Sequence, residues 1–224
     1  MSASDRRSGP GTRRWADLLQ SPLVPPGRPA RRGFQLLSGL VLYGISDAMV
    51  VAAGLGVEPW DALAQGLTRT VGLSIGLWTN LIGAAVLLLW IPLRQKPGLG
   101  TLCNVLLVGT SMDVTLALLP PFGQLWLRWA VLVAGILLNG FATGCYIGAQ
   151  AGPGPRDGLM TGLAERGHPI WAVRWGIEIA VLVIGFLLGA TVGIGTILYA
   201  CAIGPLAHLF MPLLDMGRGK GKPD

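Results

Sequence analysis

Apolar residues fill six long segments of this chain, and polar or glycine-rich breaks separate them. Each segment has roughly 20 residues, the length of helix that crosses a bilayer core of about 30 Å. The pattern therefore predicts six transmembrane helices, over residues 34–55, 73–93, 99–119, 126–149, 170–189 and 193–213.

Two further stretches, residues 58–70 and 154–166, are helix-like but too short and too polar to span a bilayer easily. Each opens with a Pro-x-Asp element, Pro59 to Asp61 in the first and Pro155 to Asp157 in the second. Proline suits the first turn of a helix, and an acidic side chain there favours the positive end of the helix dipole. We expect two short helices that are interfacial, re-entrant or spanning.

Composition supports a membrane protein, since 52% of the residues are hydrophobic and only 12% are charged. Soluble domains carry about 25% charged residues, and disordered chains are poor in apolar ones. The net charge is +6, but no basic stripe interleaved with aromatic residues indicates nucleic-acid binding. We expect an integral membrane protein with no nucleic-acid partner.

The basic residues also predict orientation. With the N-terminus in the cytoplasm, all but three of the 17 basic residues lie in cytoplasmic loops or tails, the exceptions being Arg69, Arg128 and Arg174. Basic tails of this kind are attracted to an anionic inner leaflet of the lipid bilayer. We therefore expect a multi-pass plasma-membrane protein with both termini in the cytoplasm.

The chain also repeats itself. The order Gly-x-x-Pro-x-Asp-x-Leu-x-x-Gly-Leu occurs at residues 56–67 and again, 96 positions later, at 152–163. At an offset of 95, residues 98–101 match 193–196, and Gly109 matches Gly204.

Each repeat contains three predicted crossings, an odd number, so the second repeat would be inserted upside down relative to the first. We expect an all-α membrane protein of six transmembrane helices in two inverted three-span repeats. Its predicted parts are a basic disordered cytoplasmic tail, the first membrane repeat, the second membrane repeat and a basic cytoplasmic tail, at residues 1–32, 33–121, 122–214 and 215–224.

Three runs carry a resemblance to a known family: residues 57–67 with their Pro-Trp-Asp element, residues 90–94 together with 98–101, and residues 154–160. They resemble the YczE/YitT-type bacterial membrane proteins, more closely the YczE type, and the resemblance covers residues 31–212. It implies a multi-spanning protein of the bacterial plasma membrane, without the soluble C-terminal domain of many YitT-like proteins. It implies no established chemistry.

The Pro-Trp-Asp and Pro-Arg-Asp elements are the candidates for function, with Trp60, Asp61, Arg156 and Asp157 as ligand or proton contacts. One interpretation is structural: two capped interfacial helices, with Trp60 in the aromatic belt of the membrane. The other is a binding site, because short interrupted segments at matching places in two inverted halves indicate one in transporters. Helix N-termini would favour an anionic group, whereas the aspartates would favour a cation or a bound proton.

Ionisable residues within the spans need partners. Arg174 and Glu178 are four residues apart on one helical face, which predicts an ion pair, or a proton or substrate relay. We expect Asp47 and Asp113 nearer the membrane interface than its centre, with less weight on function.

Small residues recur every four positions in the first and fourth segments and predict flat faces for helix packing. We expect these two stripes to pack the two segments against each other. Their members are Gly44, Ala48, Ala52 and Gly56 in the first, and Gly140, Gly144, Gly148 and Gly152 in the second.

No catalytic motif, metal-ligand cluster or cofactor fingerprint is visible, so we expect no enzyme activity, no metal and no cofactor. The favoured function is a transporter or permease for an unidentified small solute, with a homodimer as one arrangement. The alternative is a non-transporting accessory or scaffold protein that assembles or anchors a membrane or biosynthetic complex.

Overall fold

The structure is a computed structural model that describes residues 29–215. The expected tails at 1–32 and 215–224 therefore lie largely outside the described residues. Within residues 29–215 the chain forms helices joined by short loops and contains no strand. The helices are α2 (Pro29–Ala53), α3 (Pro59–Val71), α4 (Ile75–Leu93), α5 (Leu99–Leu118), α6 (Leu125–Gly148), α7 (Pro155–Ala164), α8 (Ile170–Leu187) and α9 (Ile194–Leu214).

Six of the described helices, α2, α4, α5, α6, α8 and α9, are long and apolar enough to cross a membrane. They confirm the six predicted spans, with bounds that differ by a few residues. The largest difference is at the start of α2, where residues 29–32, expected in the tail, form the first turn of the helix. The helices α3 and α7 occupy the two short polar stretches.

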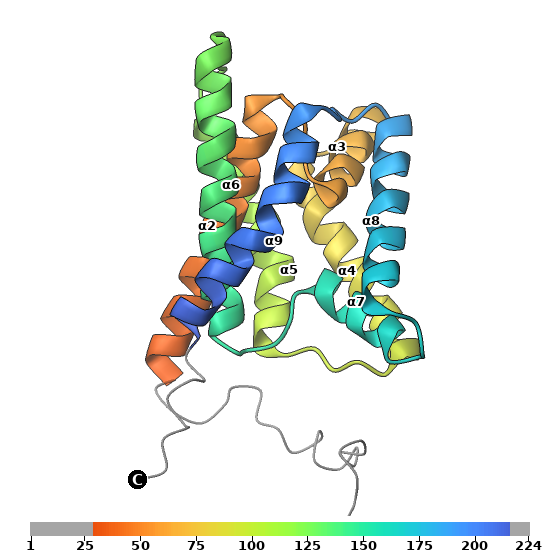
Figure 1. Cartoon of the computed structure of the whole chain (residues 1–224). Helices are drawn as coiled ribbons and strands as arrows, with labels where there is room; N and C mark the ends of the chain where they lie inside the picture. Colours follow the sequence, from red (N-terminus) through yellow and green to blue (C-terminus); the bar gives the residue numbers. More distant parts are fainter. Residues whose placement is uncertain (1–28, 216–224) are drawn as a thin grey trace, which may run out of the picture.

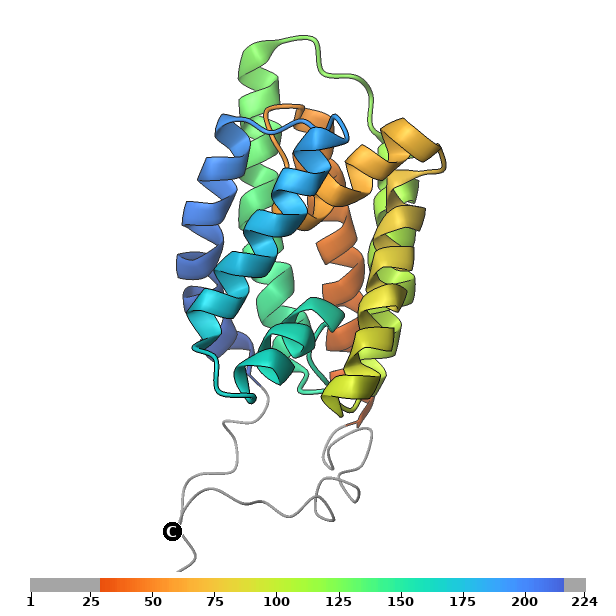
Figure 2. The ribbon, with the colours of Figure 1, turned by 90° about the vertical axis from the view of Figure 1, so that its right-hand side faces the viewer.

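The long helices run roughly along one axis, and α3 and α7 lie at opposite ends of the bundle (Figures 1 and 2). At its centre α2 packs against α6, with α5 on the outer side of α2 and α9 on the outer side of α6. The short helices are held crosswise, because α3 packs on α4 and α8 while α7 packs on α8 and α4.

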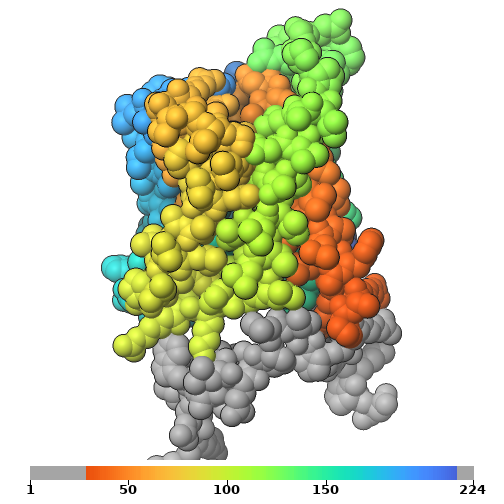
Figure 3. Space-filling model, turned by 180° about the vertical axis from the view of Figure 1, so that it is seen from behind, coloured from red at the N-terminus to blue at the C-terminus, as the bar shows by residue number. Residues whose placement is uncertain are grey.

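The pair α4 and α5 forms a closed wall on one face of the molecule (Figure 3). The backbones touch at Gly76 and Gly109, where an added Cβ on either glycine would overlap the carbonyl oxygen of the other. Two polar side chains tie the wall together: Asn80 Oδ1 accepts a bond from the Gly109 amide at 3.0 Å, and Asp113 Oδ1 accepts one from the Gly76 amide at 2.8 Å.

The small-residue stripes pack helices together, but not the pair that we expected. Gly44 on α2 lies against Val108 and Ser111 of α5, whereas Gly140 and Gly144 on α6 lie against α9. The expectation that the stripes face each other is therefore wrong.

The contact between α2 and α6 uses other glycines, Gly39 and Gly135. Periodicity located the flat faces of these helices, but spacing along one helix does not specify which neighbour covers the face.

Candidate functional site

The two short helices begin deep in the molecule, and tight loops aim their first residues inward. Gly56 and Gly152 precede them with φ of 126° and 118°, a left-handed conformation that favours glycine. Each loop is fastened to the start of a long helix: the Gly100 amide donates to Ala151 O at 2.8 Å, and the Gly195 amide donates to Leu55 O at 2.9 Å.

Opposite charges meet where the two helices begin. Arg156, the second residue of α7, forms an ion pair with Glu58, which occupies the N-cap position of α3. A second guanidinium nitrogen lies 3.9 Å from Asp61 Oδ1. The same guanidinium lies over Trp60, 5.2 Å from the ring centroid, which is cation–π geometry.

The environment of Trp60 excludes its expected place in an aromatic belt, since its side chain is buried against Trp90 and Leu159 in the interior. That expectation is therefore wrong. The structure brings together three of the predicted site residues, Trp60, Asp61 and Arg156, and adds Glu58, which the sequence reasoning missed.

Asp61 is fully buried, and neither of its side-chain oxygens accepts a hydrogen bond from any described residue. Arginine stays protonated in proteins, and the Arg156 guanidinium is paired with the Glu58 carboxylate. Arg156 is therefore a permanent cation.

A third carboxylate comes from α2. Asp47 is 1% exposed, and its Oδ1 accepts a hydrogen bond of 2.8 Å from Asn139 of α6, which also donates to Ser46 at 2.9 Å. The Tyr199 hydroxyl of α9 donates in turn to Asn139 Oδ1 at 3.0 Å. Asp47 Oδ2 accepts no hydrogen bond from any described residue.

Asp47 was not among the predicted site residues, and the fold adds it to the charged centre. One signal in the sequence could have located it. Asp47 lies between Gly44 and Ala48, two members of the small-residue stripe, and is therefore next to a face that had to be buried.

Asp47, Glu58 and Asp61, here called the carboxylate cluster, each offer one oxygen such that the three atoms lie within 4.8 Å of one another. All three residues are buried. Such a group can hold a cation with oxygen ligands. No metal-ligand pattern is visible in the sequence, because Asp47 is separated from the Pro-x-Asp element by a loop and comes close to it only in the fold.

Asp157 forms its hydrogen bond outside the carboxylate cluster. Its Oδ2 accepts a hydrogen bond of 2.9 Å from the Tyr146 hydroxyl of α6, and Tyr146 packs edge-to-face on Tyr43 with ring centroids 5.9 Å apart. Arg156 and Asp157 are consecutive residues, yet they engage different partners.

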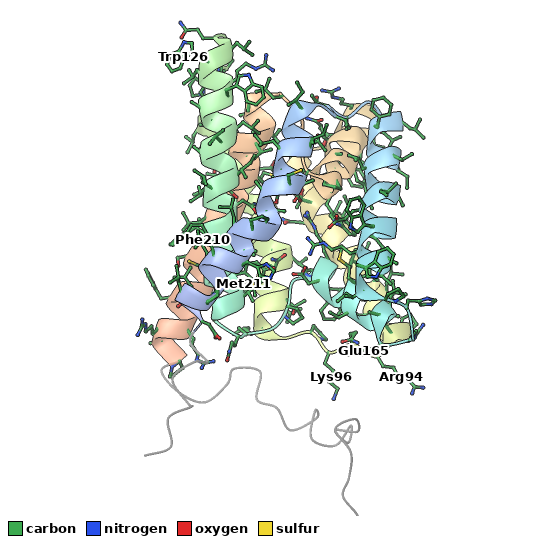
Figure 4. The ribbon with its side chains drawn as sticks, viewed as in Figure 1. Arg94, Lys96, Trp126, Glu165, Phe210 and Met211 are labelled. Atoms are coloured by element: carbon green, nitrogen blue, oxygen red, sulfur yellow. The ribbon has the colours of Figure 1, made fainter. Side chains whose placement is uncertain are left out.

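Arg174 and Glu178 form the expected ion pair on α8, at 2.9 Å. Their side chains are 54% and 31% exposed, and no described bond links them to the carboxylate cluster. One pocket, of about 370 Å³, lies elsewhere, between the last turns of α6 and α9 beside Met211 (Figure 4). The charged centre itself is closed, except that the Arg156 side chain is 21% exposed.

Comparison with known proteins gives relatives over most of the chain. Residues 30–212 match the family of unknown function DUF6198. An uncharacterised protein of Haemophilus influenzae is 42% identical over 180 residues, covering 80% of this chain and 83% of the relative. The uncharacterised membrane protein YczE of Bacillus subtilis is 31% identical, covering 78% and 83%, and YyaS of the same organism is 29% identical, covering 79% and 90%.

No solved structure matches the chain. The family match covers more than half of the chain, and the relatives align along most of their own lengths. The resemblance to YczE-type proteins is confirmed, and the chain is a multi-pass membrane protein that belongs to the DUF6198 family.

Proposed function

We propose that this protein is a transporter for a small charged solute, with α3 and α7 entering the membrane from opposite sides to form a central binding site. The observation that carries the proposal is the meeting of the two helix starts, where Arg156 of α7 pairs with Glu58 and Asp61 of α3. Half-helices whose ends converge near the bilayer midplane are the usual binding-site architecture of secondary transporters.

Matching contacts in the two halves support an inverted duplication. The start of α5 is bonded to the loop before α7, and the start of α9 is bonded in the same way to the loop before α3. Packing between helices follows the same rule, since α3 lies on α8 as α7 lies on α4. Three spans per half would then place these equivalent elements on opposite sides of the membrane.

The charge distribution supports an orientation with both termini in the cytoplasm. Arg94 and Lys96 lie at the same end of the molecule as α7 and the last turn of α9, whereas Trp126 lies at the other end (Figure 4). Basic loops favour the cytoplasmic side. The proposed location is therefore the bacterial plasma membrane, with α7 on the cytoplasmic side and α3 on the outer side.

Burial of the charged centre corresponds to an occluded state. A charge at the middle of a bilayer costs at least about 2.5–3.5 kcal/mol on insertion scales, so such residues are expected where they bind a ligand or relay a proton. Here three carboxylates and one guanidinium are gathered in the interior of the molecule. A transporter would open this centre to each side in turn.

Access to the centre from both sides tests the proposal without knowledge of the solute. An Asp61→Cys variant, on a background lacking Cys103, Cys145 and Cys201, is treated with a membrane-impermeant thiol reagent in spheroplasts and in inverted membrane vesicles. The thiol should react in both preparations. The matched control is Ala64→Cys, one turn along α3 and buried against Ala48, Ile75 and Met112, which should react in neither.

Reaction of the Asp61→Cys thiol from one side alone, or from neither, would overturn the transporter proposal. It would favour the second candidate, a non-transporting accessory protein. A specific observation supports that candidate: in α8 and α9 only 6% of the residues in the apolar window are buried, against 50% in α2 and α6. Such faces suit a partner subunit or a second copy of this chain, and a stoichiometric partner retained on purification would identify it.

A further inference from the structure

We propose that the carboxylate cluster binds one divalent metal cation of the oxygen-preferring class, such as Mg²⁺, Mn²⁺ or Ca²⁺. The inference rests on the proposed function in placing the ion at the centre of a transporter, and deepens it by naming the ion class. Metal binding is measured without transport, so the two proposals can fail separately.

The geometry fits a shared ion. Asp47, Glu58 and Asp61 each provide an oxygen, and these atoms lie within 4.8 Å of one another. Two oxygens that ligate the same Ca²⁺ at about 2.4 Å can lie at most about 4.8 Å apart. The ligands come from the last third of α2 and the start of α3, so the ion would fasten the short helix to α2.

The second observation is the lack of hydrogen bonds on the oxygens. Both side-chain oxygens of Asp61 and Oδ2 of Asp47 are buried and accept no hydrogen bond from any described residue. Buried polar atoms in folded proteins almost always have a partner. Three such atoms in one cluster indicate that a bound group interacts with these oxygens in place of a protein hydrogen-bond donor.

The charge balance favours a divalent ion over a monovalent one. The cluster holds three carboxylates, and among the described residues Arg156 is the cation that forms ion pairs with it. The sum is two negative charges when all four groups are ionised. A divalent cation neutralises the group, whereas a monovalent one leaves an unbalanced charge in a region of low dielectric constant.

Two protons would also neutralise the cluster, but they fit the geometry less well. A protonated carboxyl is a donor and needs an acceptor. No hydrogen bond joins Asp61 to Asp47, to Glu58 or to any other described residue. A metal ion binds the same oxygens directly and needs no acceptor. Arg156 acts as a positioning residue, because it holds Glu58 toward the other two ligands.

Mn²⁺ is the first probe, because its free form has an electron paramagnetic resonance signal that disappears on binding. The full chain is purified in detergent, stripped with EDTA and titrated at pH 7.5. We expect one Mn²⁺ bound per chain, competition by Mg²⁺ or Ca²⁺, and no competition by Na⁺ at equal ionic strength. The midpoint of thermal unfolding should rise with the Mn²⁺ concentration, since the ion binds the folded state.

Two variants assign the site. Asp61→Asn and Asp47→Asn should each weaken Mn²⁺ binding at least tenfold. In EDTA, Asp61→Asn should unfold at a higher temperature than the wild type, because it removes a buried charge that has no hydrogen bond, and a merely structural aspartate would show the opposite. Glu165→Gln is the control, since it removes an exposed carboxylate bonded to Gln95 and should bind Mn²⁺ like the wild type.

Failure of the stripped wild-type chain to bind Mn²⁺, Mg²⁺ or Ca²⁺ would overturn the inference, and so would binding that both cluster variants retain. The titration of the wild-type chain tests whether the protein binds a metal ion even if a variant does not fold. Metal binding together with an Asp61→Cys thiol that reacts from one side alone would keep the ion site and remove the transporter. Reaction from both sides without metal binding would do the reverse.

Discussion

The helices α3 and α7 begin with the same Pro-x-Asp element, yet their two aspartates have opposite environments. Asp157 has a hydroxyl donor, Tyr146, at 2.9 Å. Asp61 has no hydrogen-bond donor among the described residues, only the Arg156 guanidinium at 3.9 Å. The same local pattern therefore gives an aspartate with a hydrogen-bond donor in one half of the chain and a buried aspartate without one in the other. The pattern alone does not identify a ligand-binding residue.

The walls beside the two short helices differ as well. In the first half α4 and α5 are in backbone contact at Gly76 and Gly109. In the second half α8 and α9 do not pack closely, and nothing lies within 4 Å of a Cβ added at Gly204, the residue 95 positions after Gly109. In the first half α4 and α5 pack closely against each other, whereas in the second half α8 and α9 leave faces that lipid or a partner must cover.

The largest effect should come from breaking the charge pair between the two short helices. Arg156→Gln leaves Glu58 buried without its cation, and removal of one partner from a buried ion pair costs about 3–5 kcal/mol. Arg174→Gln is the matched control, since its pair with Glu178 lies on an exposed face of α8 and its loss should cost less. Thermal unfolding in detergent measures both, and equal losses would contradict the difference in burial.

The next largest expected change in stability comes from adding a methyl group at the glycine contact between α4 and α5, compared with the matching position in α9. Gly109→Ala forces the α4 and α5 backbones apart, and overpacking of this kind costs about 1–3 kcal/mol. Gly204→Ala adds a methyl group in open space, and should be neutral or stabilising by up to about 1 kcal/mol through helix propensity. If Gly204→Ala destabilises the protein as much as Gly109→Ala, then α8 and α9 pack closely in the membrane after all.

The smallest expected change in stability comes from replacing the aspartate of each Pro-x-Asp element by asparagine. Asp157→Asn keeps an acceptor for Tyr146 but removes its charge, and should destabilise the protein by about 1 kcal/mol, the difference between charged and neutral hydrogen bonds. Asp61→Asn in EDTA should have the opposite sign. Unfolding curves of the two variants under identical conditions give the change in unfolding midpoint for each. Changes of the same sign would contradict the difference between the two aspartates.

Much of the architecture was predictable, because hydropathy and helix-start signals act locally. The six spans, the starts of α3 and α7 near Pro59 and Pro155, and the Arg174–Glu178 pair all follow from spacing along one segment. The centre was predictable only in part. Trp60, Asp61 and Arg156 were identified because they belong to the repeated element.

The remaining site residues depend on which helix faces meet. Asp47 joins the cluster because α2 turns that side toward α3 and α6, and Glu58 joins it because the loop after Gly56 directs the start of α3 inward. The partners of the two small-residue stripes were mistaken for the same reason. Such contacts are long-range, so periodicity within one helix does not determine them.

The central claim is that α3 and α7 enter the membrane from opposite sides, and single-cysteine labelling tests it most directly. Val71→Cys, at the exposed last residue of α3, and His168→Cys, in the exposed loop after α7, are made on the cysteine-free background. An impermeant thiol reagent should label Val71→Cys in spheroplasts and His168→Cys only in inverted vesicles. Labelling of both from the same side would contradict the inverted arrangement and remove the main support for a central transport site.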